Sequence, residues 1–106
     1  MPAATPFRLT PKAATRAIRE RAADSFNVVL TNHAQDQMAA RDISAPEVFT
    51  ILRHGTVYEP PVLTETGEWK AEMERRMPGG GEAVAVTVLR QGDRLIVVTV
   101  MWRDGR

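Results

Sequence analysis

The sequence predicts an α+β domain in which about three helices pack on a roughly four-stranded antiparallel sheet. In the first half of the chain, apolar residues recur at helical spacing behind residues that are typical helix caps. From Thr56 onward they alternate with polar residues, as in strands with one buried face. Helices followed by a meander of strands are typical of helices packed on one face of an antiparallel sheet. We expect one domain over residues 10–106, preceded by a flexible lead, residues 1–9, which contains two prolines and no periodic pattern.

The composition is that of an ordinary globular protein. Of the 106 residues, 43% are hydrophobic and 25% are charged, and the net charge is only +1. No cysteine is present, which excludes disulfides and thiolate metal sites. The apolar runs are far shorter than the roughly 20 residues that span a bilayer. We therefore expect a cytoplasmic domain with no membrane partner and no cofactor.

The first helix is predicted to begin at Thr10 and to end near Asp24. Thr10 is a typical N-cap residue, and Pro11 suits the first helical position. The apolar stripe of this helix repeats every four residues, at Ala14, Ile18 and Ala22.

The same helix carries Lys12, Arg16 and Arg19 at helical spacing, so that one of its faces is basic. Residues 1–21 contain five basic residues and one acidic residue, a local net charge of +4. Two interpretations stay open: a solvated helix face, which is the commoner case, and a contact for a phosphate backbone.

Two further helices are predicted before the strands. A β-branched run at residues 27–30 indicates a short strand, and Thr31 or Asn32 can cap the helix that follows. "SAPE", residues 44–47, is a capping box that opens a third helix. We expect Gly55 to close that helix in a left-handed conformation. Its buried stripe is predicted to be Val48, Ile51 and Leu52.

Three strands are predicted in the second half, "EWKAEMERR", "EAVAVTVLR" and "RLIVVTVMW", joined by the hairpin connections "MPGGG" and "QGD". Alternation in the first strand turns Trp69, Ala71 and Met73 toward the helices. Its opposite face then carries a row of charges: Lys70, Glu72, Glu74 and Arg76.

A single hydroxyl marks the last predicted strand. Thr99 alternates there with Ile96, Val98 and Val100, and it interrupts an otherwise aliphatic face. A lone threonine in a strand is more often structural than functional, so its role depends on what lies beside it.

The second helix has a polar stripe made by His33, Gln37 and Arg41, which follow one another at intervals of four residues. Such a stripe belongs either to a surface helix, the commoner case, or to the wall of a cleft. The two histidines, His33 and His54, are 21 residues apart, and no clustered acidic motif accompanies them. A metal-dependent nuclease is therefore disfavoured.

The segment "TNHAQDQMAARDISAPEVFTILRHGTVYE", followed by "GEWKAEM", a valine-rich strand and "LIVVTVMW", resembles a family of small bacterial domains. Its pattern is Thr/Ser-x-His-Ala, then Gln/Arg-Met, Arg, Ile-Ser, Glu-Val and a later Gly. The resemblance covers about residues 28–102. That family is grouped with the metal-independent ribonucleases of the barnase, EndoU, colicin and RelE-like fold, which includes RelE-like and BrnT-like toxins. It implies RNA as a partner, together with an antitoxin or immunity protein.

By this resemblance the site residues are His33, Arg41, Lys70 and Thr99, and the reaction is cleavage of RNA without a metal. That reaction removes a proton from the 2′-hydroxyl, gives one to the leaving 5′-oxygen and stabilises negative charge on phosphorus. Histidine, with a reference pKa of about 6.5, suits either proton transfer. Arginine and lysine suit the charged phosphate, threonine can orient it, and Glu72 is a second candidate proton carrier. We assign RNA contacts to Arg16, Arg19, Arg76 and Trp102.

Two other functions stay open. The near-neutral net charge favours a non-catalytic protein-binding or inhibitory module of RelE-like fold, because ribonucleases that hold RNA tightly are often more basic. The third alternative is a structural or regulatory domain without any site. Salt separates RNA binding from protein binding, since only the former is expected to weaken steeply as salt rises.

Overall fold

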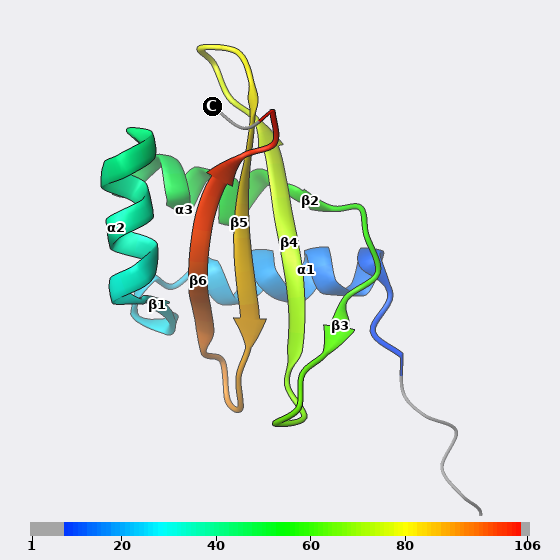
Figure 1. The fold of residues 1–106 in the computed structure, drawn as a ribbon. Helices are drawn as coiled ribbons and strands as arrows, with labels where there is room; N and C mark the ends of the chain where they lie inside the picture. Colours follow the sequence, from blue (N-terminus) through cyan, green and yellow to red (C-terminus); the bar gives the residue numbers. More distant parts are fainter. Residues whose placement is uncertain (1–7, 105–106) are drawn as a thin grey trace, which may run out of the picture.

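The computed structural model describes residues 8–104, so that most of the predicted flexible lead lies outside the described residues. Within them the chain forms α1 (Pro11–Ala22), a short 3-10 helix η1 (Ser25–Asn27), α2 (Asn32–Arg41) and α3 (Ala45–His54). The strands are β1 (Val28–Leu30), β2 (Thr56–Val57), β3 (Val62–Leu63), β4 (Trp69–Arg76), β5 (Glu82–Leu89) and β6 (Leu95–Trp102). The predicted α+β class is confirmed (Figure 1).

Side-chain caps start the three α-helices where the sequence predicts them. The hydroxyls of Thr10 and Thr31 accept the amides of Ala13 and Ala34 at 3.1 and 3.0 Å. At α3 the Ser44 hydroxyl accepts the Glu47 amide, and the Glu47 carboxylate accepts the Ser44 amide at 2.9 Å, which completes the capping box. Each cap satisfies an amide that the helix itself leaves without a partner.

The expectation for Gly55 is wrong. Its φ and ψ angles of −77° and −173° are extended, a conformation that any residue adopts. Glycine is needed there because the backbone passes too close: a Cβ atom would lie 2.5 Å from the carbonyl oxygen of Ile51 and 2.8 Å from that of Glu74. The left-handed residue is instead Asp42, which ends α2 with φ 56°.

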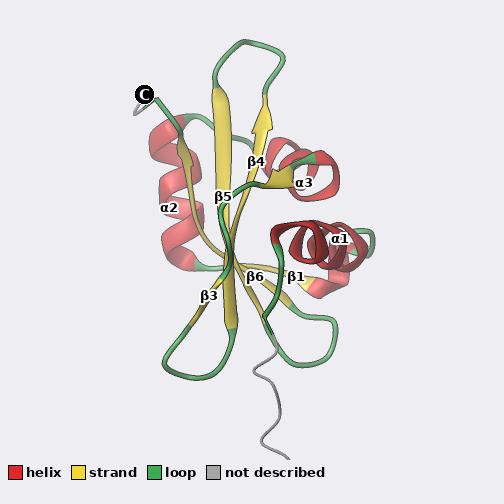
Figure 2. Ribbon diagram, turned by 90° about the vertical axis from the view of Figure 1, so that its right-hand side faces the viewer, coloured by secondary structure: helices red, strands yellow, loops and turns green. Residues whose placement is uncertain are grey.

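The sheet has the strand order β1-β6-β5-β4-β2, and β3 pairs with β4 as well. The two hairpins give the antiparallel centre, as predicted, but β1 pairs with β6 in parallel. Helices α1 and α3 lie together on one side of the sheet (Figure 2). Their buried stripes and the inward residues of β4, β5 and β6 form one core.

A β-bulge interrupts β6 and decides where its side chains point. Thr99 pairs with Val86, but Val97 pairs with the next residue, Thr87, so that Val98 is an extra residue. The prediction that side chains alternate strictly between the two faces along this strand is therefore wrong. Beyond the bulge, Val100 belongs to the core, whereas Thr99 lies on the opposite face of the sheet.

None of the helices in residues 8–104 combines the length and the apolar character that crossing a membrane requires.

Candidate functional site

One face of the central sheet carries no helix over β4 and β5 among the described residues (Figure 2). The inward residues of these strands pack into the core, so that their neighbours in sequence face the other way. The open face is the set of these outward residues: Lys70, Glu72, Glu74 and Arg76 of β4, Glu82, Val84, Val86 and Val88 of β5, and Ile96, Thr99 and Met101 of β6.

Helix α2 lies beside β6 and is tied to it at both ends. The Thr31 hydroxyl lies 3.0 and 3.1 Å from the carbonyl oxygens of Val97 and Val98, to which it can donate. At the other end, the indole N–H of Trp102 donates to the carbonyl oxygen of Arg41 at 3.0 Å. The ten residues of α2 and the last four to five of β6 both span about 15 Å, so the two elements run in step.

This register sets the level of His33 along the strand. His33 follows the Thr31 anchor by two residues, a rise of about 3 Å, which is also about one residue along a strand. Because Thr31 is bonded at Val97 and Val98, His33 lies level with Thr99. Arg41, by the same reasoning, lies level with Trp102.

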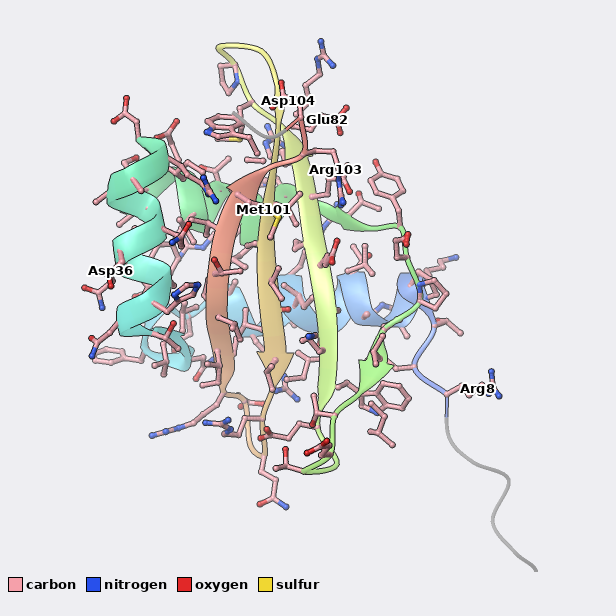
Figure 3. The ribbon with its side chains drawn as sticks, in the orientation of Figure 1. Arg8, Asp36, Glu82, Met101, Arg103 and Asp104 are labelled. Carbon is pink, nitrogen blue, oxygen red and sulfur yellow. The ribbon has the colours of Figure 1, made fainter. Side chains whose placement is uncertain are left out.

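The right-handed twist and the orientation of α2 determine the side on which its polar stripe lies. The helix rises alongside β6 with buried Ala34 toward the sheet, and Asp36 points away from it (Figure 3). In a right-handed helix of 100° per residue, the stripe of His33 and Gln37 then lies on the side of the open face. His33 is exposed there, and Gln37 is half-buried.

Three of the candidate catalytic residues therefore share one cross-row of the open face. Glu72 of β4 pairs with Val86 of β5, Val86 pairs with Thr99 of β6, and His33 lies beyond Thr99 on α2. Glu72 and Thr99 are separated by two strand spacings, about 10 Å. We call the row of Glu72, Val86, Thr99 and His33 the cross-row. The polar group in its middle is the hydroxyl of half-buried Thr99.

Two predicted cations flank the cross-row. Lys70 is exposed two residues before Glu72 on β4, a separation of about 7 Å. Arg41 is half-buried near the far end of β6, and its Nε atom is buried without a hydrogen-bond partner among the described residues. Such an unpaired buried donor is costly.

Arg103 is a residue of this surface that the sequence reasoning missed. Its Nη2 atom lies 3.1 Å from a carboxylate oxygen of Glu72 and 2.7 Å from one of Glu74. These bonds, that of Glu74 first, raise the pKa of Arg103. Because Arg103 follows β6 and the glutamates belong to β4, its side chain spans β5 (Figure 3). The alternation of positions 99, 101 and 103 was a signal that could have found it.

The residues assigned to RNA contacts lie in different places. Trp102 is half-buried against the core, and Arg76 is exposed at the end of β4 with Glu82 at 3.8 Å. Arg19 donates to the carbonyl oxygens of Gly55, at 3.0 and 2.6 Å, and His54, at 3.3 Å. Arg16 and Arg19 belong to α1 and so lie across the sheet from the cross-row (Figure 2).

Several hollows mark the described surface near these residues. One of about 410 Å³ adjoins the open face where the hairpin of β4 and β5 meets the chain end, and is lined by Glu74, Arg76, Gly81, Glu82, Arg103 and Asp104. A larger one of about 570 Å³ lies at α1. Among residues 8–104, no group of three or more histidine, aspartate or glutamate side chains is placed to hold a metal ion.

A family model, described as a domain of unknown function (DUF4258), matches residues 30–102. No curated protein and no solved structure matches the chain. The matched segment contains α2, α3 and strands β2 to β6, and thus the whole cross-row. Helix α1 precedes it, and Arg103 follows directly after it.

Proposed function

This chain belongs to the DUF4258 family, and we propose that it is a metal-independent endoribonuclease of the toxin type, related to the RelE-like ribonucleases, which acts at the open face. The observation that carries the proposal is the cross-row: a histidine, a hydroxyl and a carboxylate at one level of the sheet, from three different elements. Two cations, Lys70 and Arg41, lie above and below this level.

The chemistry assigns one role to each group of the cross-row. Glu72, as a carboxylate, accepts the proton of the 2′-hydroxyl while its oxygen attacks the adjacent phosphorus. The bond from phosphorus to the 5′-oxygen then breaks, and protonated His33 gives its proton to that leaving oxygen. The products are a 2′,3′-cyclic phosphate and a 5′-hydroxyl. Thr99, between the two proton carriers, donates a hydrogen bond to the phosphate.

The flanking cations stabilise the charge that develops on the phosphate. Lys70 is exposed and provides a mobile point charge. Arg41 is half-buried and provides planar donors for the non-bridging oxygens. Preorganised donors of this kind act without reorganisation at the moment of reaction.

The test is cleavage of a labelled, mixed-sequence single-stranded RNA by the purified chain in the presence of EDTA, with the cyclic phosphate as the product to be detected. His33→Ala is expected to lower the rate by about 10² to 10⁴, the typical contribution of a positioned acid or base. His54→Ala is the matched control, because His54 is also exposed but belongs to α3. Equal rates for His33→Ala and the parent chain would rule out the proposed site.

A non-catalytic protein-binding module is the second candidate, and the pairing of the open-face charges favours it. Arg103 already bonds both Glu72 and Glu74, and Arg76 lies near Glu82, so this surface carries little net charge for RNA to bind. Titration of the same RNA at increasing salt distinguishes the two functions. A ribonuclease site predicts RNA binding that weakens steeply with salt, whereas the protein-binding module predicts no RNA binding at any salt concentration.

A further inference from the structure

A hollow of about 570 Å³ lies between α1 and β2, across the sheet from the open face. The amide of Val57 donates to the hydroxyl of Thr15 at 2.9 Å, and this bond joins the strand to the helix. We call this hollow the α1 hollow; it is lined by Pro11, Lys12, Thr15, Arg16, Arg19, Glu20, Thr56 and Val57. Its volume is in the range of sites that bind ligands or partner side chains.

The rim of the α1 hollow is cationic. Lys12 and Arg16 are exposed one turn apart, and neither forms an ion pair within residues 8–104. Arg19 adds a fixed positive charge, because its guanidinium is anchored on the carbonyl oxygens that end α3. Against these three cations, Glu20 is the one acidic residue found in the described lining. The rim therefore attracts carboxylates or phosphates.

The floor of the α1 hollow is mostly apolar. Pro11 and buried Val57 provide aliphatic surface, and the threonines add methyl groups. The hydroxyl of Thr15 is already used, since it donates to the carbonyl oxygen of Pro11 at 2.9 Å and accepts the Val57 amide. Beside the floor, the next residue along the chain, Tyr58, is 64% exposed and adds an aromatic ring. A ligand thus needs an apolar group between its negative charges.

We propose that the α1 hollow binds an acidic segment of a partner protein, which seats an apolar side chain on the floor and carboxylates beside Lys12 and Arg16. The spacing fits: Lys12 and Arg16 are about 6 Å apart along the helix, the span of one turn of a bound helix or two residues of an extended chain. RNA fits the described lining less well, because single-stranded RNA binds by stacking successive bases on aromatic side chains, whereas the lining itself contains none and Tyr58 lies only beside it.

The proposal does not depend on the ribonuclease function, because this hollow and the open face lie on opposite sides of the sheet. Binding here does not cover the cross-row. The two sites can therefore be tested separately, on the same full-length chain.

The experiment is titration of the isotopically labelled full chain, followed by its amide NMR spectrum. The probe is a short acetylated peptide in which leucines alternate with glutamates; a second peptide has glutamines in place of the glutamates. The acidic peptide is expected to shift the amide signals of Thr15, Thr56 and Val57, and the neutral peptide to bind about tenfold more weakly. No shift of these signals at millimolar acidic peptide would overturn the proposal.

Charge reversal supplies the matched variants. Lys12→Glu and Arg16→Glu together are expected to lower the affinity for the acidic peptide by at least about tenfold. Lys70→Glu reverses one positive charge on the open face instead and should leave the affinity for the peptide unchanged. Both lysines and Arg16 are exposed, and the amide spectrum itself reports whether each variant is folded. Stronger shifts of the same signals by single-stranded oligouridylate than by the peptide would instead assign the hollow to RNA.

Discussion

The indole N–H of Trp102, the last residue of β6, donates to the main-chain carbonyl oxygen of Arg41, the last residue of α2, at 3.0 Å. This bond satisfies one of the carbonyls that a helix leaves unpaired at its C-terminus. It also holds α2 along the half of β6 that β1 does not cover, since β1 pairs only with Leu95 to Val97. The helix thus protects an otherwise free strand edge and fixes the level of the polar stripe beside the open face.

Trp102→Phe tests this relationship, because it keeps an aromatic ring and removes the donor. We expect the free energy of unfolding to fall by about 1 kcal/mol, the usual effect of losing one hydrogen bond in a partly buried site. Amide hydrogen exchange should also become faster in Ala39 to Asp42, at the end of α2. Urea unfolding and exchange measure the two effects, with Tyr58→Phe as the control at an exposed position. An unchanged exchange rate at the end of α2 would show that the bond does not anchor the helix.

Gly55→Ala should be among the most destabilising single substitutions of the described chain. The new Cβ atom would lie 2.5 and 2.8 Å from two main-chain carbonyl oxygens, and neither α3 nor β4 can move away without losing core contacts. We expect a loss of about 3 kcal/mol in the free energy of unfolding. Gly79→Ala is the control: it lies in open space in the hairpin loop, with no positive φ, and should cost less than about 0.5 kcal/mol. Similar urea midpoints for the two variants would contradict this account.

Local signals were sufficient to predict much of the fold. Each helix cap bonds amides of its own helix, so residues close in sequence determine its geometry. The caps are Thr10, Thr31 and the capping box of Ser44 and Glu47. The parallel pairing of β1 and β6 joins residues 28 and 95, and nothing near either position indicates it. The same holds for Gly55, whose constraint comes from Glu74, a distant residue.

The pKa of Glu68 provides a pH-dependent prediction. Arg90 donates to its carboxylate at 2.6 and 3.3 Å, and these hydrogen bonds lower the pKa of Glu68 below 4.5. A folded-state pKa below the unfolded one adds stability at higher pH, and this stability is lost as the pH falls through the folded pKa. Arg90→Gln should therefore raise the pKa of Glu68 toward 4.5 and reduce the acid dependence of stability. Carboxyl NMR titration measures the shift, and Arg94→Gln on the same hairpin should leave it unchanged.

The candidate site was predictable in its residue types but not in its arrangement. The resemblance indicated His33, Thr99 and Lys70, and alternation placed Lys70 and Glu72 on one face of β4. The bulge at Val98 turns Thr99 onto that same face, and a rule of strict alternation cannot foresee an extra residue. Whether the residues perform catalysis is a separate question, which needs variants that differ only in their place on the open face.

Glu72 and Glu74 provide such a pair. Both are glutamates of β4, both point to the open face, and both bond Arg103, at 3.1 and 2.7 Å. Only Glu72 lies in the cross-row with Thr99, whereas Glu74 lies opposite Val84 and Met101.

If Glu72 accepts the proton of the 2′-hydroxyl, Glu72→Gln should lower the rate of RNA cleavage by about 10² or more, because the amide cannot act as a base. Glu74→Gln keeps an oxygen that accepts from Arg103 but loses the charge of the carboxylate, and it removes no proton acceptor of the cross-row. It should stay within about twofold of the parent rate, a change of under 1 kcal/mol in the barrier. Single-turnover rates with the labelled RNA measure both variants, and urea unfolding shows whether they are equally folded. If the two substitutions slow cleavage equally, the glutamates act through Arg103 and not as a base at the cross-row.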